Sequence, residues 1–454
     1  MNEKKAPVMR VRDMSTGNPI RLILAFAIPL FIGNVFQQFY NMVDTMVVGY
    51  TLGDSAISAI GATSSLYSLL INFASGLNAG YGIIVTQRFG AKDQIGLKRA
   101  VSGMILLDLA AVALLTGLSA AFLRPLMVFM NTPASILDQA YGYMIVICCG
   151  MVSTVGYNLF AGILRALGNS RTPLYFLIVS SILNILLDLL LVAKLHMGLP
   201  GAATATVISQ SISAALCGLY LLRNYRELMP EAADFRVPGK LLGELLSMGV
   251  SVGMMNCLVE FSSVIFQRAN NGMGETIIAA HTAARKIIML MIQPLVTIST
   301  AFSTFTAQNW GAQCYGRIRS TLKKVLGMVL LWSILACSVV YLFGSGIIRL
   351  TTGTEDPEII RNAVMSMRIH LPFYPLLGTL FCLRHSLQSM GSKSVPIFSS
   401  CLELAIKIFS AAVLIPALGY LGTCITEPAA WTVMAAFLAV YYLTRRKTIF
   451  PDLA

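Results

Sequence analysis

The sequence predicts an all-α membrane protein of about twelve transmembrane helices, in two six-helix lobes related by a pseudo-two-fold axis along the membrane normal. Three observations lead to this prediction. The 454 residues are 56% hydrophobic and 12% charged, a composition too apolar for a water-soluble domain. Apolar stretches of about 20 residues, the length that a bilayer span requires, recur along the whole chain. Segments of the first half return in the second half.

The apolar stretches are predicted to be helices that end at charged or glycine- and proline-containing connections. They lie at residues 20–48, 55–86, 99–121, 139–163, 173–193, 201–222, 241–268, 276–307, 323–348, 362–386, 395–416 and 421–444. We expect no signal peptide, because Lys4, Lys5, Arg10 and Arg12 precede the first stretch without an apolar core and that stretch is too long.

Lysine and arginine are distributed unequally between alternate loops. With the N-terminus inside, 24 of the 33 Lys and Arg residues, Arg384 among them, fall on the cytoplasmic side and six on the other. Cytoplasmic loops retain an excess of positive charge, so this count predicts a multi-pass protein of the inner (plasma) membrane with both termini in the cytoplasm. It also accounts for the net charge of +13 without a nucleic-acid partner, because the basic residues lie in short loops.

An internal repeat relates the two halves at a nearly constant offset. VTQRFGA at 85–91 matches TAQNWGA at 306–312, LRALGNSRTP at 164–173 matches LQSMGSKSVP at 387–396, MGLPGAA at 197–203 matches LGYLGTC at 418–424, and TLGDSAISAIGA at 51–62 matches NGMGETIIAAHT at 271–282.

The repeat predicts an N-terminal lobe at 1–225, a cytoplasmic linker at 226–240 and a C-terminal lobe at 241–454. Because each half has an even number of spans, both halves are expected to begin on the same side of the membrane. Two such lobes around a cleft are typical of alternating-access carriers. A duplicated helical scaffold without transport is the alternative interpretation.

Three carboxylates of the first half, Asp44, Asp108 and Asp188, lie in apolar stretches whose interiors contain no lysine or arginine. A charge inside the bilayer is unfavourable, so such residues usually mark a transport pathway or a proton relay. Burial without a cation favours the protonated form of a carboxyl group, which can then load and release a proton. Asp108 lies deeper than the others, in a segment with no second polar partner.

The helical rise of about 1.5 Å per residue places Asp44, Asp188 and Thr206 in one layer near the outer ends of their helices. Tyr40 and Asn184 lie one turn deeper, each four residues from a carboxylate and on the same helix face. An oxygen-rich layer of this kind suits Na⁺ or a transferable proton. The alternative is a set of polar residues that only hydrogen-bond the helices together.

The second half carries different groups. Glu403 and Lys407 are one turn apart and can form an ion pair. Glu260 is the candidate contact for a substrate cation or a second ion, and an ion pair with Arg285 or Lys286 is the alternative.

Further polar positions extend the candidate sites. Glu427 occupies the position that the repeat pairs with Thr206, so the same layer is expected to be polar in both lobes. Gln37 and Tyr143 join Glu260 as candidates for contacts to substrate or to a second ion.

Catalytic and cofactor motifs are missing from the sequence. The four histidines lack metal-ligand spacing, the nine cysteines form no C-x-x-C pair, and there is no G-x-x-x-x-G-K-[ST] motif. We therefore expect neither an enzyme nor a nucleotide-driven pump, and no cofactor. An intramembrane enzyme remains the alternative from another functional class.

Five segments, in order, resemble the multidrug and toxic compound extrusion family. They are IPLFIGNVFQQFYNMVDTMVVGYTLG at 28–53, LRALGNSRTP at 164–173, NILLD at 184–188, GLPGAATAT at 198–206 and AQNWGA at 307–312. The resemblance covers nearly the whole chain. It implies an exporter of cationic or amphipathic organic compounds that exchanges them for Na⁺ or H⁺ and works as a monomer in the lipid bilayer.

The resemblance also implies roles for individual residues. Asp44 looks like the family's carboxylate in helix 1, and Asn184, Asp188 and Thr206 look like the rest of its N-lobe cation site, where Na⁺ would bind. Tyr40 is similar to a supporting hydroxyl of that site.

Glu260 resembles the helix 7 acid that some branches of the family use. A related class of the superfamily flips lipid-linked oligosaccharides. Arg285, Lys286 and Lys407 keep this alternative open, because an anionic pyrophosphate favours cations.

Overall fold

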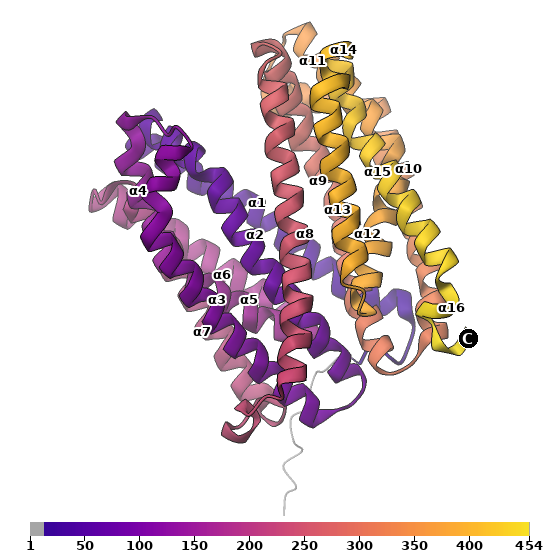
Figure 1. Cartoon of the computed structure of the whole chain (residues 1–454). Helices are drawn as coiled ribbons and strands as arrows, with labels where there is room; N and C mark the ends of the chain where they lie inside the picture. The colour runs from indigo at the N-terminus through magenta and orange to yellow at the C-terminus, as the bar shows by residue number, and fades with distance from the viewer. Residues whose placement is uncertain (1–12, 454) are drawn as a thin grey trace, which may run out of the picture. The chain divides into compact units, whose positions relative to one another are not determined.

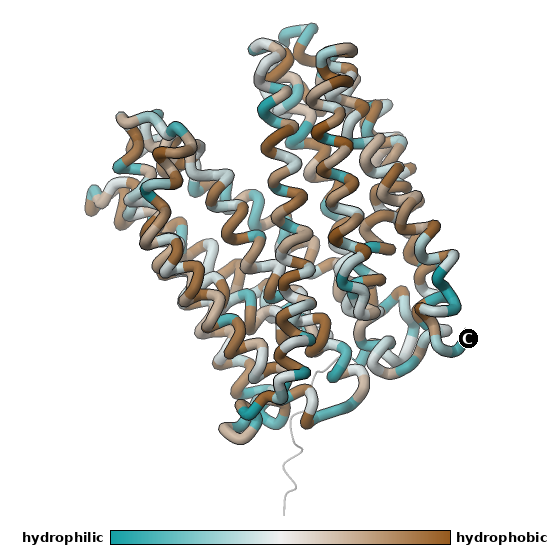
Figure 2. Tube along the Cα trace, in the orientation of Figure 1, coloured by the Kyte–Doolittle hydropathy of each residue, from teal (hydrophilic) through white to brown (hydrophobic). Residues whose placement is uncertain are grey.

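The computed structural model describes residues 13–453, so Lys4, Lys5, Arg10 and Arg12, which were counted for the topology, lie outside the described residues. Between residues 13 and 453 the chain forms helices joined by short connections, without a strand. Figure 2 shows hydrophobic residues along the helices and hydrophilic residues gathered mainly near their ends. The predicted all-α class is confirmed.

The helices of the first half run in chain order (Figure 1). They are α1 (Pro19–Leu52), α2 (Asp54–Gly90), α3 (Gln94–Phe129), α4 (Ala134–Cys149), α5 (Met151–Ala166), α6 (Arg171–Asp188), η1 (Leu189–Lys194) and α7 (Gly198–Asn224), followed by the short turns η2 (Arg226–Leu228) and η3 (Ala232–Phe235).

The second half continues with a similar succession of helices. They are α8 (Gly239–Asn271), α9 (Glu275–Gly311), α10 (Tyr315–Thr352), α11 (Pro357–His370), η4 (Leu371–Phe373), α12 (Tyr374–Ser389), α13 (Ser394–Phe409), η5 (Ser410–Leu414), α14 (Ile415–Leu418), α15 (Tyr420–Thr444), α16 (Arg446–Ile449) and η6 (Pro451–Leu453).

Within the described residues, ten helices are long and apolar enough to cross a bilayer, or eleven if α4 and α5 are one span bent by 43°. The region predicted at 362–386 is occupied by α11, η4 and α12, which are interrupted where Pro372 and Pro375 remove backbone donors. Two of the predicted spans are therefore broken rather than straight. Counting α4 with α5 and α11 with α12 as one segment each gives six helical segments in each half, although α11 and α12 are not among the helices long and apolar enough to span.

The sequence repeat is also a repeat of backbone geometry. Left-handed φ angles recur at or close to the repeat offset, at Gly53 and Gly274, Lys92 and Gln313, Asn131 and Gly353, Gly168 and Gly391, and Gly198 and Gly419. The same offset separates the starts of the π-helices η1 and η5, and it separates the breaks at Gly150 and Leu371. The two halves therefore share one chain path.

The structure divides into two compact units. The first contains Ile28–Gly253 together with the described residues up to Thr16, and the second contains Gly17–Ala27 and Met254–Ala454. The long helices α1 and α8 each contribute residues to both units.

A hydrophobic core of the first unit holds the helices that carry the candidate site. Its buried members include Val48 of α1, Ala59 of α2, Met144 of α4, Val192 of η1 and Ala202 of α7. Because these side chains are almost fully removed from solvent, they fix the positions of five separate elements relative to one another.

Close backbone packing of α2 against α8 also belongs to the first unit. A Cβ atom on Gly80 would lie 2.5 Å from the carbonyl oxygen of Met248, and one on Gly249 would lie 2.2 Å from the ring of Tyr81. Gly80 and Gly249 each belong to a G-x-x-x-G sequence, with Gly76 and Gly253 respectively. Such motifs let two helices approach closely within a bilayer.

Candidate functional site

The five residues predicted to form the ion site come together in the first unit. Tyr40 and Asp44 lie on α1, Asn184 and Asp188 on the last turn of α6, and Thr206 on α7. Asn184 and Asp188 are fully buried, and the other three residues are half-buried. Segments far apart in the chain therefore supply one cluster of side-chain oxygen atoms.

The centre of the cluster is a contact between two acids. The carboxyl groups of Asp44 and Asp188 lie within hydrogen-bonding reach of each other. In each group, the oxygen Oδ1 is buried and has no hydrogen-bond partner. Two carboxyl groups can hydrogen-bond only through a proton, so this contact suits a pair that carries at least one proton.

Asn184 links this pair to α7. With its amide nitrogen facing Asp188, Nδ2 donates to Asp188 Oδ2 at 2.9 Å and the amide oxygen accepts from the backbone N–H of Thr206 at 3.1 Å. In the opposite orientation, Nδ2 donates to Thr206 Oγ1 at 3.3 Å. The first orientation satisfies more groups and therefore fits the surroundings better. The side chains of Tyr40 and Thr206 are also hydrogen-bonded to each other.

The local sequence explains why Asn184 and Asp188 face the same way. They are four residues apart on α6, which places them on one helix face. Directly after Asp188 the helix widens into the π-helix η1. Short π-helical segments are frequent at functional sites.

Tyrosines surround the acid pair. Tyr143 of α4, predicted as a substrate contact, lies close enough to Asp44, Asp188 and Tyr40 to interact with each electrostatically. Tyr67 of α2 also faces Asp44 and was missed by the sequence analysis. One tyrosine in an apolar helix gives no signal of the direction in which it points.

Gln37, the third predicted substrate contact, lies on α1 one turn before Tyr40 and is exposed. The face of α1 that carries Tyr40 and Asp44 therefore continues with a third polar side chain, that of Gln37.

The arrangement can bind a small cation. Carboxylate, amide and hydroxyl oxygens are the ligands that hard cations prefer, and the two buried Oδ1 atoms without partners are free to accept a proton or to contact a metal ion. Across residues 13–453, no group of three or more His, Cys, Asp or Glu side chains could hold a metal ion. A site for Na⁺ here would therefore depend on the neutral oxygens of Asn184 and Thr206.

The second unit contains a buried cluster of charges. Lys407 Nζ donates to Glu403 Oε1 at 3.0 Å, as predicted from their spacing. Arg384 Nη2 lies 4.0 Å from Glu403 Oε2 and donates to the sulfur of Met434 at 3.2 Å. Arg384 Nε is buried without a partner.

One residue in the topology count, Arg384, was assigned to the wrong place. Arg384 was counted as a cytoplasmic loop residue, but it is only 4% exposed, inside α12. Its place near the end of a predicted apolar stretch gave no sign that Glu403, on another helix, lies opposite it.

The remaining predicted acids of the second unit are separate from this cluster's ion pairs. Glu427 Oε2 lies 3.7 Å from His370 Nε2. Glu260 is half-buried on α8. Partly buried acids are therefore present in this unit as well, but their surroundings differ from those of the acid pair.

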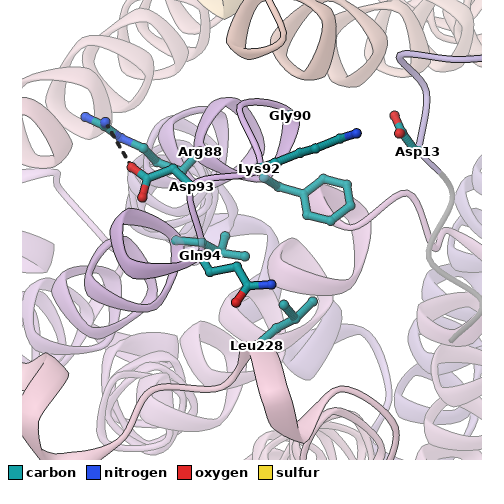
Figure 3. A pocket seen from close by; sticks show the side chains of 9 residues that line it. Asp13, Arg88, Gly90, Lys92, Asp93, Gln94 and Leu228 are labelled. Carbon is teal, nitrogen blue, oxygen red and sulfur yellow. Dashed lines mark ion pairs between the residues drawn. The ribbon is translucent and has the colours of Figure 1, made fainter. Parts of the chain in front are cut away.

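The first unit also has a cavity of about 360 Å³ beside the connection between α2 and α3. Figure 3 shows its lining, with an ion pair between Arg88 and Asp93, whose charged atoms are 3.6 Å apart, and with the side chain of Lys92 extending away from that pair. Both acids and bases line this cavity, so it has no clear preference for the charge of a ligand.

Comparison with known proteins gives a consistent result. The sequence model of the MatE family matches residues 29–190 and 252–413, once in each half. The "Probable multidrug resistance protein YpnP" of Bacillus subtilis (strain 168) is 25% identical over 385 residues, which is 85% of each chain. The "Probable multidrug resistance protein YoeA" of the same organism is 26% identical over 432 residues, 93% of each chain.

A solved structure shares the fold. The protein described as "Crystal structure of MATE in the bent conformation" superimposes with a TM-score of 0.89 at 21% identity, over 97% of this chain and 98% of its own. The repeated helical architecture is thus one that has been observed before.

Proposed function

The chain belongs to the MatE family of membrane transporters, and on this premise we propose that it exports cationic or amphipathic organic compounds in exchange for H⁺ or Na⁺. The drug cargo is supported by relatives that are described as multidrug resistance proteins. The protein acts as a monomer in the plasma membrane, by alternating access. It has no catalytic role and needs no cofactor.

The observation that carries the coupling mechanism is the close approach of the two carboxyl groups of Asp44 and Asp188. A pair of acids that shares a proton can lose it when a cation of another kind arrives. Opposite charges attract strongly in a medium of low dielectric constant, so a cationic drug and the coupling ion compete for the same carboxylates. Binding of one then lowers the affinity for the other.

The close approach of two acids favours H⁺ as the coupling ion, because two carboxyl groups can hydrogen-bond to each other only through a proton. Na⁺ is the second candidate, with Asp188, Asn184 and Thr206 as its ligands. Asp44 lies in the second half of α1, and Pro29 interrupts the hydrogen-bond ladder of the same helix nearer its start. Ion binding can therefore change the bend of α1 at Pro29, or at Gly33 one turn later.

The test is efflux of ethidium, a fluorescent organic cation, from proteoliposomes under an imposed H⁺ gradient and then a Na⁺ gradient. We expect gradient-driven efflux by the wild-type protein, and an efflux rate lowered about 5–150-fold in Asp44→Asn, the range that coupling free energies of about 1–3 kcal/mol produce. The matched control is Asp138→Asn, because Asp138 is exposed and paired with Arg124 at 2.8 Å, and this variant should behave as the wild type. Full gradient-driven efflux by Asp44→Asn at normal protein levels would contradict the mechanism.

A second candidate function is the flipping of a lipid-linked oligosaccharide. The buried cluster of Arg384, Lys407 and Glu403 favours it, because two cations share one acid and a pyrophosphate is anionic. In the same liposomes, no ethidium efflux under either gradient, together with translocation of a fluorescent lipid-linked oligosaccharide, would favour this function over antiport.

Both termini are placed in the cytoplasm in this proposal, as the loop charges require. A protease-cleavable tag after Ala454 is then expected to resist external protease in intact cells and to be cut in inside-out vesicles. A matching tag inserted after Asn131, in the connection between α3 and α4, should give the reverse pattern. Cleavage of the C-terminal tag in intact cells would reverse the orientation.

A further inference from the structure

Asp108 of α3 has a place in neither the acid pair nor the ion pairs described above. It is only 4% exposed, and its Oδ1 accepts a hydrogen bond from Asn78 Nδ2 of α2 at 3.0 Å. The sequence analysis found no polar partner for Asp108 within its own segment, and the partner comes from another helix. The second oxygen, Oδ2, is buried without any partner, and so is Oδ1 of Asn78.

This carboxylate lines a cavity of about 370 Å³ in the first unit. The wall is built from α3, α5 and α7, and α5 packs against both of the other helices. Most of the lining is apolar, including Leu109, Val112, Leu159 and Phe160. Its volume falls within the range of about 300–1,000 Å³ that is common for small-molecule sites.

The cavity reaches the apolar surface of the unit. Leu109 and Val152, which belong to its lining, have 57% and 52% of their surface exposed. Asp108 lies well within the span, because α3 extends from Gln94 to Phe129 and the carboxyl group is several turns from either end. A molecule dissolved in the hydrocarbon layer can therefore reach the carboxyl group without crossing the polar headgroups.

A second polar feature lies on the wall. The hydroxyl groups of Ser153 and Ser211 are 2.6 Å apart and hydrogen-bonded, and Ser211 also donates to the carbonyl of Val207 at 2.7 Å. No lysine or arginine is among the residues that line the cavity. An acyl chain would fill the apolar part but offers no hydrogen-bond donor or positive charge to the carboxyl group of Asp108.

We propose that this cavity is a binding site for lipophilic amines, whose ammonium N–H donates to the carboxyl group of Asp108 while the apolar body packs between α3, α5 and α7. An amine that arrives as the free base accepts the proton of a neutral Asp108. An ammonium ion that arrives charged pairs with the carboxylate. Both routes give the same ion pair, which matches one charge to one charge. The site is separate in sequence and in helices from the acid pair of α1 and α6.

The experiment measures binding and does not depend on transport. Purified protein in lipid nanodiscs is photolabelled with a dodecyl dimethylamine that carries a diazirine, and with an uncharged analogue in which carbon replaces nitrogen. Labelled peptides are then mapped by mass spectrometry. In the wild type, the amine should label α3 and α5 more strongly than the uncharged analogue does.

The first variant is Asp108→Asn. The new amide can donate to the free Oδ1 of Asn78 and still accept from its Nδ2, so the variant should fold as well as the wild type. Labelling of α3 and α5 by the amine is expected to fall by about tenfold or more, the range of a hydrogen bond to a charged group. Labelling by the uncharged analogue should not change. Undiminished amine labelling would overturn the proposal and leave an apolar pocket for acyl chains.

The second variant is Gly156→Leu, which fills the cavity without altering its charge. A Cβ at Gly156 would have only an ordinary contact, 3.7 Å from the Cβ of Ala214, so the helix can accept it. Labelling by both probes should fall. Asp44→Asn serves as the matched acid control and should leave labelling of α3 and α5 intact. Loss of that labelling in Asp44→Asn would overturn the proposal, because the amine would then depend on the acid pair.

Discussion

Asp188→Asn is expected to lower gradient-driven ethidium efflux about 5–150-fold, the range that coupling free energies of about 1–3 kcal/mol produce. The fold should survive, because an asparagine at this position can still hydrogen-bond to Asn184. What disappears is the second carboxyl group, so the pair can no longer alternate between a shared proton and a bound cation. Efflux rates in proteoliposomes, normalised to the amount of inserted protein, provide the measurement.

The double variant Asp44→Asn/Asp188→Asn provides the sharper result. If both acids form one binding unit, the double variant should be no worse than either single variant, because the first substitution already destroys the unit. Losses that multiply would mean two independent acids and would contradict the shared-proton mechanism. Asp138→Asn again provides the baseline for removing an aspartate from an exposed position.

Glu403→Gln is expected to lower the free energy of unfolding by about 3–5 kcal/mol, the usual effect of removing one partner from a buried ion pair. Lys407 and Arg384 would keep their charges with no acid at hydrogen-bonding distance, and both side chains are only 5% exposed. Because water cannot solvate them there, the uncompensated charge is unfavourable. Unfolding followed by intrinsic fluorescence in detergent micelles, under chemical denaturant, measures the change.

Two comparisons make this result specific. Glu355→Gln removes one partner of an exposed ion pair, with Arg349 at 3.7 Å, and should change stability by less than about 1 kcal/mol. Adding Lys407→Met to Glu403→Gln removes one of the two uncompensated cations and should recover part of the loss. A change at Glu403 as small as that at Glu355 would mean that water reaches the cluster.

Sequence patterns were sufficient for the helices and for the repeat. A stretch of apolar residues must be a helix in a bilayer, because the backbone can satisfy its hydrogen bonds there only within the segment. Segment positions could therefore be read from composition alone, and the repeat offset reappears in the left-handed residues and in the π-helices η1 and η5. The breaks at Gly150 and Leu371 were missed, since hydropathy does not distinguish a bent span from a straight one.

Part of the site around the acid pair could be predicted from positions along single helices. Depth along each helix placed Asp44, Asp188 and Thr206 in one layer, and spacing by four placed Asn184 on the face of Asp188. The repeat gave no help, because the positions that it pairs with Asp44 and Asp188 are Ile265 and Phe409. The acidic site therefore belongs to one half of an otherwise duplicated chain.

By itself, the sequence determined which segments are helical, that they repeat, and which polar residues share a depth, because each depends on the order of residues along one axis. Tertiary structure alone decided which helix faces meet. It brings Asp44 close to Asp188 and places Arg384 near Glu403. It also places Asp108 at hydrogen-bonding distance from Asn78 and in the wall of a cavity. Rotation of a helix about its axis leaves its hydropathy unchanged, whereas such contacts depend on that rotation and on the packing of neighbouring helices.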